Sequence, residues 1–315
     1  AGGRRRPPPT RMTTPGPGRG SIPAGRRGRM SSAGRGLGGE QVEGRQAVRE
    51  LLSAGRRPVR EVWMLDERGD SPILDDIRRL AAARRVPVLP VSRARFVARS
   101  RCEAPQGVLA VADPLPESTL EDLLAPPGGG APFLIALDGI TDPGNLGAVL
   151  RSAECAGATG AVLPRHRAVH VTPAATKAAA GAVEHLPIAV VGGLPTALAD
   201  LRRVGVHLVG LDGGASATLD ELVGAEGPVC LVLGSEGRGL SRLVRQRCDQ
   251  VLAIPTAGAL SSLNVSAAAT LACFDVARQR RTSSGGGRGG AGRGRPAEPE
   301  GGRPAEPEAG VEPAT

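Results

Sequence analysis

The stretch that decides the fold is FLIALDGITDPGNLGAVLRSAECAGATGAVLP, residues 133–164. Two short apolar runs, 133–138 and 160–164, enclose a segment with helical spacing that begins near Asn145. Runs that are apolar at every position are typical of strands buried on both faces, and a helix between two such strands favours parallel pairing. Ligands bind beyond the carboxyl ends of such strands. The turn after Asp138 is therefore a candidate site.

The same alternation continues toward the C-terminus. Four further apolar runs alternate with helical patterns, at 186–191, 206–212, 229–234 and 251–255. Repeated strand–helix alternation of this kind predicts a parallel sheet that is covered by helices on both faces. The sequence thus predicts an α/β domain over residues 131–280.

A smaller α/β domain is predicted over residues 39–115. Helical spacing is found at 44–55 and 73–85, and strands are predicted at 59–65, 86–91 and 107–112. A unit of this size is small but viable as an independent fold. The sequence PPGGG (126–130) is typical of a connection, so residues 116–130 are predicted to be a linker.

The whole net charge of +9 falls in residues 1–38, which contain nine arginines and no acidic residue. Frequent Gly and Pro predict a disordered basic tail that holds phosphates loosely. A mitochondrial transit peptide is disfavoured because Gly and Pro would break its amphipathic helix; a start assigned too early, with Met12 or Met30 the true start, is a third interpretation. Residues 281–315 repeat GRPAEPE and are also predicted to be disordered.

Composition excludes several function classes. With one Trp, three Phe and no Tyr, the chain has few rings on which single-stranded bases could stack. No apolar run approaches the roughly 20 residues of a membrane span, and no signal-peptide core is visible. The five cysteines lack metal-binding spacing, so we expect no metal, no disulfide and a cytoplasmic protein with reduced, mostly buried thiols.

Three motifs follow strand ends. In the first, at 138–160, Arg151 and Glu154 have the i, i+3 spacing of a helical ion pair.

The second motif is LVLGSEGRGLS (231–241). It inverts the GxGxxG spacing of dinucleotide sites and follows a late strand, which argues against an ordinary Rossmann enzyme. Its glycines still allow a ligand to approach the backbone closely. The third, GALSSLNVSAAATLACF (258–274), gathers Ser261, Ser262 and Asn264 before a helix, where capping explains one polar residue but not three.

Together, NLGAVLRSAECAG, LGSEGRGLS and IPTAGALSSLNVSAA resemble the three ordered motifs of the SpoU (TrmH-like) branch of the SPOUT RNA methyltransferases. EGRQAVRELL and PQGVLAV resemble that family's ribosomal-protein-like RNA-binding domain, so the resemblance covers about residues 39–280. It implies a deep trefoil knot in the C-terminal domain, a homodimer, and S-adenosylmethionine-dependent methylation of a ribose 2′-hydroxyl in RNA. The resemblance is strongest to bacterial 23S rRNA guanosine 2′-O-methyltransferases.

The resemblance also implies the cofactor contacts. They are the loop at Gly234, the backbone at Ile254, and Leu263. Main-chain groups and apolar side chains suit an adenine ring and a sulfonium that carries its own positive charge. No histidine has a place in the motifs, so ordinary surface or packing roles are expected for all four.

The implied catalytic residues are Asn145, Arg151, Glu236 and Asn264. Arg151 is expected to clamp an RNA phosphate and to orient the 2′-hydroxyl, because an arginine hardly deprotonates in a protein. Asn145 would orient Arg151 or the ribose, and Glu236 would pair with Arg151 or hold the glycine loop. Asn264 and the substrate-binding Ser262 would line the point of methyl transfer. The general base stays open.

Two other functions stay open beside methylation of 23S rRNA. A tRNA 2′-O-methyltransferase of the same family is disfavoured by the separate N-terminal domain, which members acting on tRNA often lack. A non-enzymatic RNA-binding protein would differ in a measurable way, because it need not bind S-adenosylmethionine.

Overall fold

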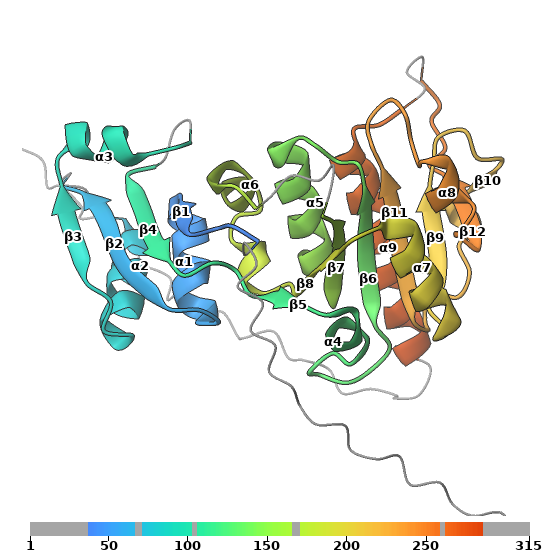
Figure 1. The fold of residues 1–315 in the computed structure, drawn as a ribbon, viewed down its shortest axis with the longest axis horizontal. Helices are drawn as coiled ribbons and strands as arrows, with labels where there is room; N and C mark the ends of the chain where they lie inside the picture. Colours follow the sequence, from blue (N-terminus) through green and yellow to red (C-terminus); the bar gives the residue numbers. More distant parts are fainter. Residues whose placement is uncertain (1–36, 67–70, 103–105, 166–170, 259–261, 286–315) are drawn as a thin grey trace, which may run out of the picture. The chain divides into compact units, whose positions relative to one another are not determined.

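A computed structural model describes residues 37–66, 71–102, 106–165, 171–258 and 262–285 (Figure 1). The predicted tails lie outside these residues except at their inner edges, and Ser261 also lies outside them. No helix in this part of the chain is long and apolar enough to cross a membrane. The described residues form two sheets.

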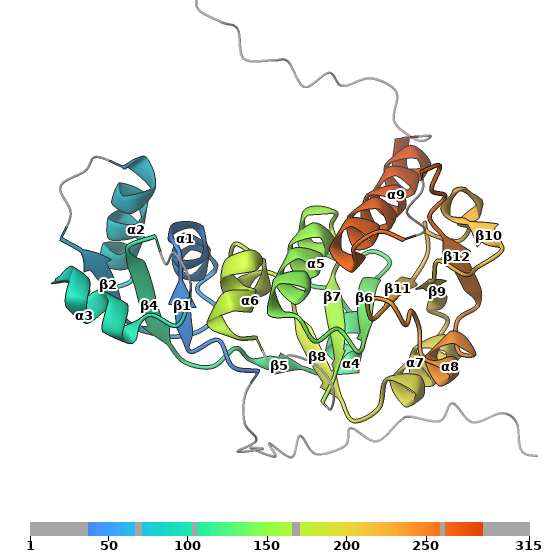
Figure 2. The same cartoon turned by 90° about the horizontal axis from the view of Figure 1, so that it is seen from above.

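The first sheet has the strand order β1-β4-β2-β3. Its strands are β1 (Gln41–Glu43), β2 (Val59–Leu65), β3 (Val88–Val91) and β4 (Val108–Ala112). β2 pairs antiparallel with β4 and parallel with β3. The helices α1 (Arg45–Ala54) and α2 (Pro72–Ala83) cover one face, and the short α3 (Arg93–Arg99) packs on the other (Figure 2).

The second sheet has eight strands in the order β10-β12-β9-β11-β6-β7-β8-β5, and every pairing is parallel, as predicted. Its strands are β5 (Glu117–Ser118), β6 (Phe133–Asp138), β7 (Gly160–Pro164), β8 (Ile188–Val191), β9 (His207–Leu211), β10 (Ala217–Thr218), β11 (Val229–Gly234) and β12 (Gln250–Ala253). β11 is in register with β6 up to the pair Gly234 and Asp138. The carboxyl ends of these neighbours are therefore level.

Helices cover both faces of this sheet (Figure 2). On one face lie α5 (Pro143–Cys155), α6 (Pro173–Ala178), the 3₁₀ turn η1 (Ala182–Glu184) and α9 (Val265–Gly285). On the other lie α4 (Leu120–Leu124), α7 (Leu194–Arg203) and α8 (Arg242–Arg245), and a second 3₁₀ turn, η2 (Leu219–Glu221), precedes β11. The strands are apolar at almost every position because both of their faces pack against helices.

The predicted linker, 116–130, is partly folded. β5 adds an edge strand beside β8, and α4 begins with a capping box in which Thr119 and Asp122 exchange hydrogen bonds. Leu123 is buried at Gly160, where even a Cβ would meet its side chain. One buried leucine in a five-residue helix is too short a pattern to be recognised in the sequence.

The boundaries of the predicted tails also need correction. Leu37 is buried in the core of the second sheet, and Gly38 forms a bridge with Val171, so the fold begins before residue 39. At the other end α9 continues to Gly285, beyond the predicted limit of 280. The hydroxyl groups of Thr282 and Ser283 donate to the carbonyl of Gln279 and extend the last turn.

A buried ion pair connects residues far apart in the chain. Arg57, just before β2, donates to both carboxylate oxygens of Glu184 in η1, at 3.0 and 2.6 Å. The two side chains are 2% and 0% exposed. The same guanidinium donates to the carbonyls of Gly39 and Asp113, so its donors are well satisfied. Charges are retained in such a place only when they are paired and hydrogen-bonded.

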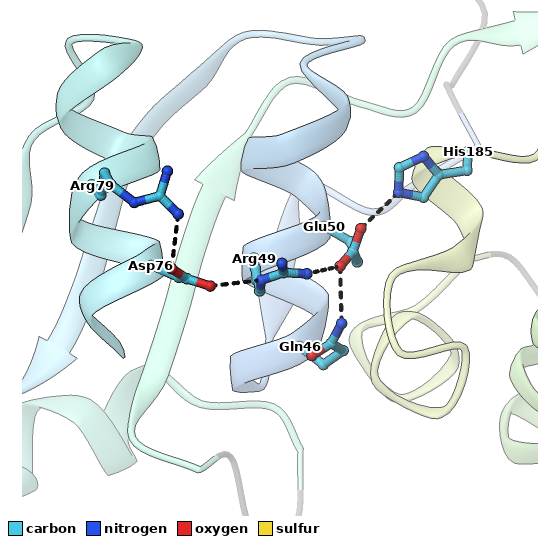
Figure 3. Close-up of polar contacts among 6 residues, drawn as sticks. All are labelled: Gln46, Arg49, Glu50, Asp76, Arg79 and His185. Carbon is cyan, nitrogen blue, oxygen red and sulfur yellow. Dashed lines mark hydrogen bonds and ion pairs between the residues drawn. The ribbon is translucent and has the colours of Figure 1, made fainter. Parts of the chain in front are cut away.

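A more exposed polar network includes His185, the residue after Glu184 in the chain (Figure 3). Glu50 of α1 accepts from Gln46 and Arg49 and contacts the ring of His185 at 2.9 Å. Arg49 also reaches Asp76 of α2 at 3.3 Å. The network links α1 with α2 and with the chain that follows η1.

Candidate active site

A cavity of about 580 Å³ lies at the carboxyl ends of β9, β11 and β12. Its wall is formed by the residues after these strands and by the start of α9: 212–214, 234–239, Ile254 with Thr256, and 262–265. Carboxyl ends of parallel strands are where open α/β sheets bind ligands, and the volume lies in the usual range of roughly 300–1,000 Å³ for small-molecule sites.

The glycine loop after β11 is closed by its own backbone. Ser235 and Gly239 exchange two hydrogen bonds, at 3.2 and 3.0 Å. A Cβ at Gly234 would overlap the backbone of Gly239, and Gly237 and Gly239 have φ values of 76° and 64°. The glycine at 234 is thus required by the loop's fold, whereas a Cβ at Gly237 would meet nothing within 4 Å.

Three polar side chains form a hydrogen-bonded cluster at the cavity. Asn145 Nδ2 donates to Glu236 Oε1 at 3.0 Å. Asn264 Nδ2 donates to the same Oε1 at 2.7 Å and to Asn145 Oδ1 at 3.0 Å. We call Asn145, Glu236 and Asn264 the amide–carboxylate cluster. It unites all three sequence motifs across separations of 91 and 119 residues.

Local structure fixes both asparagines. Asp142 caps α5 and accepts the backbone N–H of Asn145 at 2.9 Å. Asn264 stands before α9, where its Oδ1 accepts the backbone N–H of Ser266 at 2.8 Å. Asn264 is therefore a cap through its oxygen and a member of the cluster through its nitrogen.

Two aspartates at strand ends were not assigned any role from the sequence. Asp138 accepts the backbone N–H of Ser241 at 2.7 Å and fixes the far end of the glycine loop. Asp212 lines the cavity; burial opposes its ionisation, but the Gly214 N–H and the Arg245 guanidinium outweigh burial and lower its pKa. The sequence did contain a signal for these two aspartates, because each follows a leucine at the carboxyl end of a strand. Asp138 is the last residue of β6, and Asp212 comes directly after β9.

The predicted residues divide into two groups. The cavity lining contains the predicted residues Gly234, Glu236, Ile254, Ser262, Leu263 and Asn264, and Asn145 joins through the cluster. Arg151 is not in the lining; it is exposed and makes no hydrogen bond or ion pair within the part of the chain that the structure describes.

Neither of the two pairings considered for Arg151, with Glu154 or with Glu236, is formed among the described residues of this chain. Glu236 is bonded by two amides instead. Helical geometry separates Arg151 from Glu236: Arg151 is six positions after Asn145, which turns Arg151 about 120° around α5 from the cluster.

The thiols lie away from the cluster. All five cysteines are free, of which Cys230 and Cys273 are buried and Cys155 is exposed. Burial raises the pKa of Cys273 to about 12, and burial together with Asp249 raises that of Cys248 to about 12. Within the described ranges no group of three His, Cys, Asp or Glu side chains is arranged to hold a metal ion.

Two family models and several known proteins match this chain. Residues 132–274 match the SpoU rRNA Methylase family, and residues 41–118 match the family described as RNA 2′-O ribose methyltransferase substrate binding. A protein of Pseudomonas aeruginosa named 23S rRNA (guanosine-2′-O-)-methyltransferase RlmB is 39% identical over 244 residues, which cover 76% of this chain and 97% of the relative. The relative of the same name from Haemophilus influenzae is 38% identical and is covered over 98% of its length.

Solved structures show the same family likeness. The SpoU methyltransferase AviRb from Streptomyces viridochromogenes, in complex with the cofactor AdoMet, superimposes with a TM-score of 0.64 and 28% identity over 77% of this chain and 90% of that one. These likenesses define the class, an RNA methyltransferase that uses S-adenosylmethionine. Within that class, the chain belongs to the SpoU rRNA methylase family.

Proposed function

We propose that this enzyme methylates the 2′-hydroxyl of a guanosine in 23S ribosomal RNA, in the cytoplasm. The observation that carries the proposal is the near-full-length match to relatives named for that reaction, at 39% and 38% identity. The match includes the N-terminal segment as well as the methyltransferase segment, since it covers 97% and 98% of those relatives.

The cavity fits S-adenosylmethionine. Leu211, Leu252, Ile254 and Leu263 provide apolar surface for an adenine ring, and the open space beside Gly237 lets a ligand approach the backbone. The carboxylates of Asp212 and Glu236 lie in the same lining and suit a ligand with positive charge. When bound, S-adenosylmethionine supplies a methyl group activated by its sulfonium. Gly234, Ile254 and Leu263 are the residues that we propose hold it.

The amide–carboxylate cluster would position the ribose. Each of its asparagines is fixed by a helix start and by Glu236, so its remaining oxygen lone pairs have a defined direction. A reaction that depends on alignment of a hydroxyl with a methyl group gains most from such rigid groups. Ser262, on the cavity wall beside Asn264, would contact the same nucleotide.

Arg151 would bind the RNA phosphate beside the reacting ribose. A guanidinium stays protonated in proteins, and its planar fork matches a phosphate with two parallel hydrogen bonds. Since Arg151 lies outside the cavity lining of its own chain, we propose that Arg151 of the partner subunit completes the site.

A homodimer is consistent with the surface of α9. Leu271 and Phe274, three residues apart on this helix, are 48% and 43% exposed. Side chains at this spacing lie on one helix face, and exposed apolar patches of this kind mark protein interfaces. A twofold contact is the commonest assembly for a soluble enzyme.

The domain roles follow the predicted division. We propose that residues 39–115 bind substrate RNA and that residues 131–280 transfer the methyl group. We also propose the deep trefoil knot of the resembled family. It is supported by the return of the chain from β12, which lies next to the edge strand β10, to α9 packed on α5, where Ser152 and Thr270 share a hydrogen bond of 2.7 Å.

The test is transfer of labelled methyl groups to unmodified 23S rRNA, followed by mapping of 2′-O-methylated positions. We expect one guanosine to be methylated. Methylation of tRNA but not of 23S rRNA would overturn the proposed substrate. RNA binding with neither S-adenosylmethionine binding nor transfer to either RNA would instead favour a protein that binds RNA without modifying it.

A further inference from the structure

The short helix α3 and the residues that follow it carry a concentrated positive charge. Between Ser92 and Cys102 the sequence SRARFVARSRC contains four arginines and no acidic residue. All four side chains are exposed, while Phe96 anchors the helix in the core of the domain. The whole body of the chain from 39 to 280 is neutral overall, so this local excess is not a general property of the protein.

Arg95 and Arg99 form no ion pair with a carboxylate among the described residues, and both are held on an aromatic ring instead. On α2, by contrast, Arg78 pairs with Asp75 and Arg79 pairs with Asp76. Arg95 and Arg99 lie over the indole ring of Trp63, at 4.8 and 5.6 Å from its centroid. A cation held on an aromatic face keeps its in-plane N–H donors available.

Trp63 is a fixed support for these two guanidinium groups. It is 7% exposed and packs with Val91, Phe96 and Leu109 between α3 and the sheet. Its Nε1 has no hydrogen-bond partner among the described residues, so packing holds the ring in place. Arg95 and Arg99 are four residues apart, which places them on one helix face with Cβ atoms about 6 Å apart. That spacing is comparable to the separation of neighbouring phosphates along an RNA strand.

We propose that Arg95 and Arg99, together with Arg101, form a docking surface for the sugar–phosphate backbone of the substrate RNA. We call these residues the α3 surface. The inference rests on the proposed function, since it takes RNA as the substrate, and it locates on the N-terminal domain the side chains that bind it. Trp63 holds the guanidinium groups of Arg95 and Arg99, and Arg101 adds a third exposed positive charge beside them. Such groups suit phosphates and carry no information about base identity.

The binding experiment uses the full chain and a fully paired RNA hairpin of arbitrary sequence, over a series of salt concentrations. We expect Arg95→Ala/Arg99→Ala to bind roughly tenfold more weakly at low salt. The slope of log affinity against log salt should fall by about 1.5, because each phosphate contact contributes about 0.7–0.9. The basic N-terminal tail contributes equally to every variant, so the difference in slope isolates the α3 surface.

Arg78→Ala/Arg79→Ala is the matched control. It removes the same two charges from the same domain, but from α2, which covers the opposite face of the sheet. The charge-preserving variant Arg95→Lys/Arg99→Lys should keep most of the slope, and its thermal unfolding shows whether loss of the guanidiniums on Trp63 has damaged the fold. If the alanine variants of α3 and α2 lose binding equally, or if neither loses it, the proposal is wrong.

A second readout locates the contact. Trp63 is the single tryptophan and the chain has no tyrosine, so intrinsic fluorescence reports on the α3 surface. RNA should change this emission, and S-adenosylmethionine should not; an unchanged emission on RNA binding would overturn the proposal. Methyl transfer to 23S rRNA is measured separately. If 23S rRNA is methylated but Arg95→Ala/Arg99→Ala binds RNA as well as the unchanged protein does, this inference alone is overturned. If that variant binds RNA more weakly but 23S rRNA is not methylated, only the proposed substrate is overturned.

Discussion

Two glutamates each connect distant segments of this protein, and their surroundings differ completely. Glu184 is fully buried and receives the guanidinium of Arg57 on both oxygens. Glu236 is exposed at the cavity and receives only the amide N–H groups of Asn145 and Asn264. One carboxylate is paired with a cation within the fold, and the other has only neutral hydrogen-bond partners among the described residues.

The difference indicates which glutamate serves the fold and which serves a ligand. A buried carboxylate without a cation would be strongly destabilising, so Arg57 is obligatory for Glu184. An exposed carboxylate needs no such partner, because water and a positively charged ligand can balance it. Substituting glutamine at each position removes the charge at nearly constant shape and therefore tests the comparison directly.

The largest expected effect is on stability, from Glu184→Gln. This change leaves the guanidinium of Arg57 buried without a counter-charge, and breaking a buried pair in this way costs about 3–5 kcal/mol. Urea unfolding measures the loss. Asp75→Asn is the control, since it removes the acid of the exposed pair with Arg78 and should change stability by less than about 0.5 kcal/mol. Equal losses in the two variants would contradict the structural role of Glu184.

The next effect is on catalysis, from Arg151→Ala. Methyl transfer should fall by roughly two orders of magnitude, about 2.7 kcal/mol, because the phosphate and the 2′-hydroxyl are no longer aligned. S-adenosylmethionine affinity should stay within a few fold, and Arg151→Lys should rescue transfer poorly. Calorimetry and labelled-methyl transfer measure the two quantities.

Arg203→Ala on α7 is the matched control for Arg151, since it removes an exposed arginine that pairs with Asp200. It should leave transfer unchanged. Near-wild-type transfer by Arg151→Ala would show that the amide–carboxylate cluster needs no cation, and Arg151 would then be an ordinary surface residue.

The sequence predicted the buried strands best. The runs 133–138, 160–164 and 229–234 coincide with β6, β7 and β11, because strands covered on both faces are apolar almost throughout. The predicted strand 59–65 also coincides with β2, although Arg60 and Glu61 interrupt its apolar residues. The sequence did not predict α3, in which one buried residue, Phe96, stands among exposed arginines. Elements that bury a single side chain leave no periodicity to detect.

The resemblance to the SpoU motifs singled out Asn145, Glu236 and Asn264, and the structure brings these three side chains into contact. Their roles in the reaction stay predictions. Which of their atoms form hydrogen bonds with one another depends on the phase of α5 and on the closure of the glycine loop. The phase of α5 also keeps Arg151 out of the cluster. The ion pair of Arg57 and Glu184 spans 127 residues and has no local sequence signal.

A smaller effect is expected for Glu236→Gln. The glutamine oxygen can still accept from both asparagines, so the unfolding midpoint should not change. The lost negative charge should weaken S-adenosylmethionine binding by about tenfold, or 1.4 kcal/mol. Calorimetric titration measures this beside urea unfolding. If Glu236→Gln were destabilised as much as Glu184→Gln, the distinction between a fold carboxylate and a ligand carboxylate would be wrong.

The smallest effect is expected at Asn264, which belongs to both kinds of contact. Its oxygen caps α9 through Ser266, and its nitrogen holds Glu236 and Asn145. Asn264→Ala should lose about 1 kcal/mol of stability through the cap and should also slow methyl transfer. Asn264→Ser restores a good capping oxygen but offers no amide, so it should recover the stability and not the transfer. Recovery of both would show that the amide is dispensable; recovery of neither would mean that the cluster, like the pair of Arg57 and Glu184, holds the fold together.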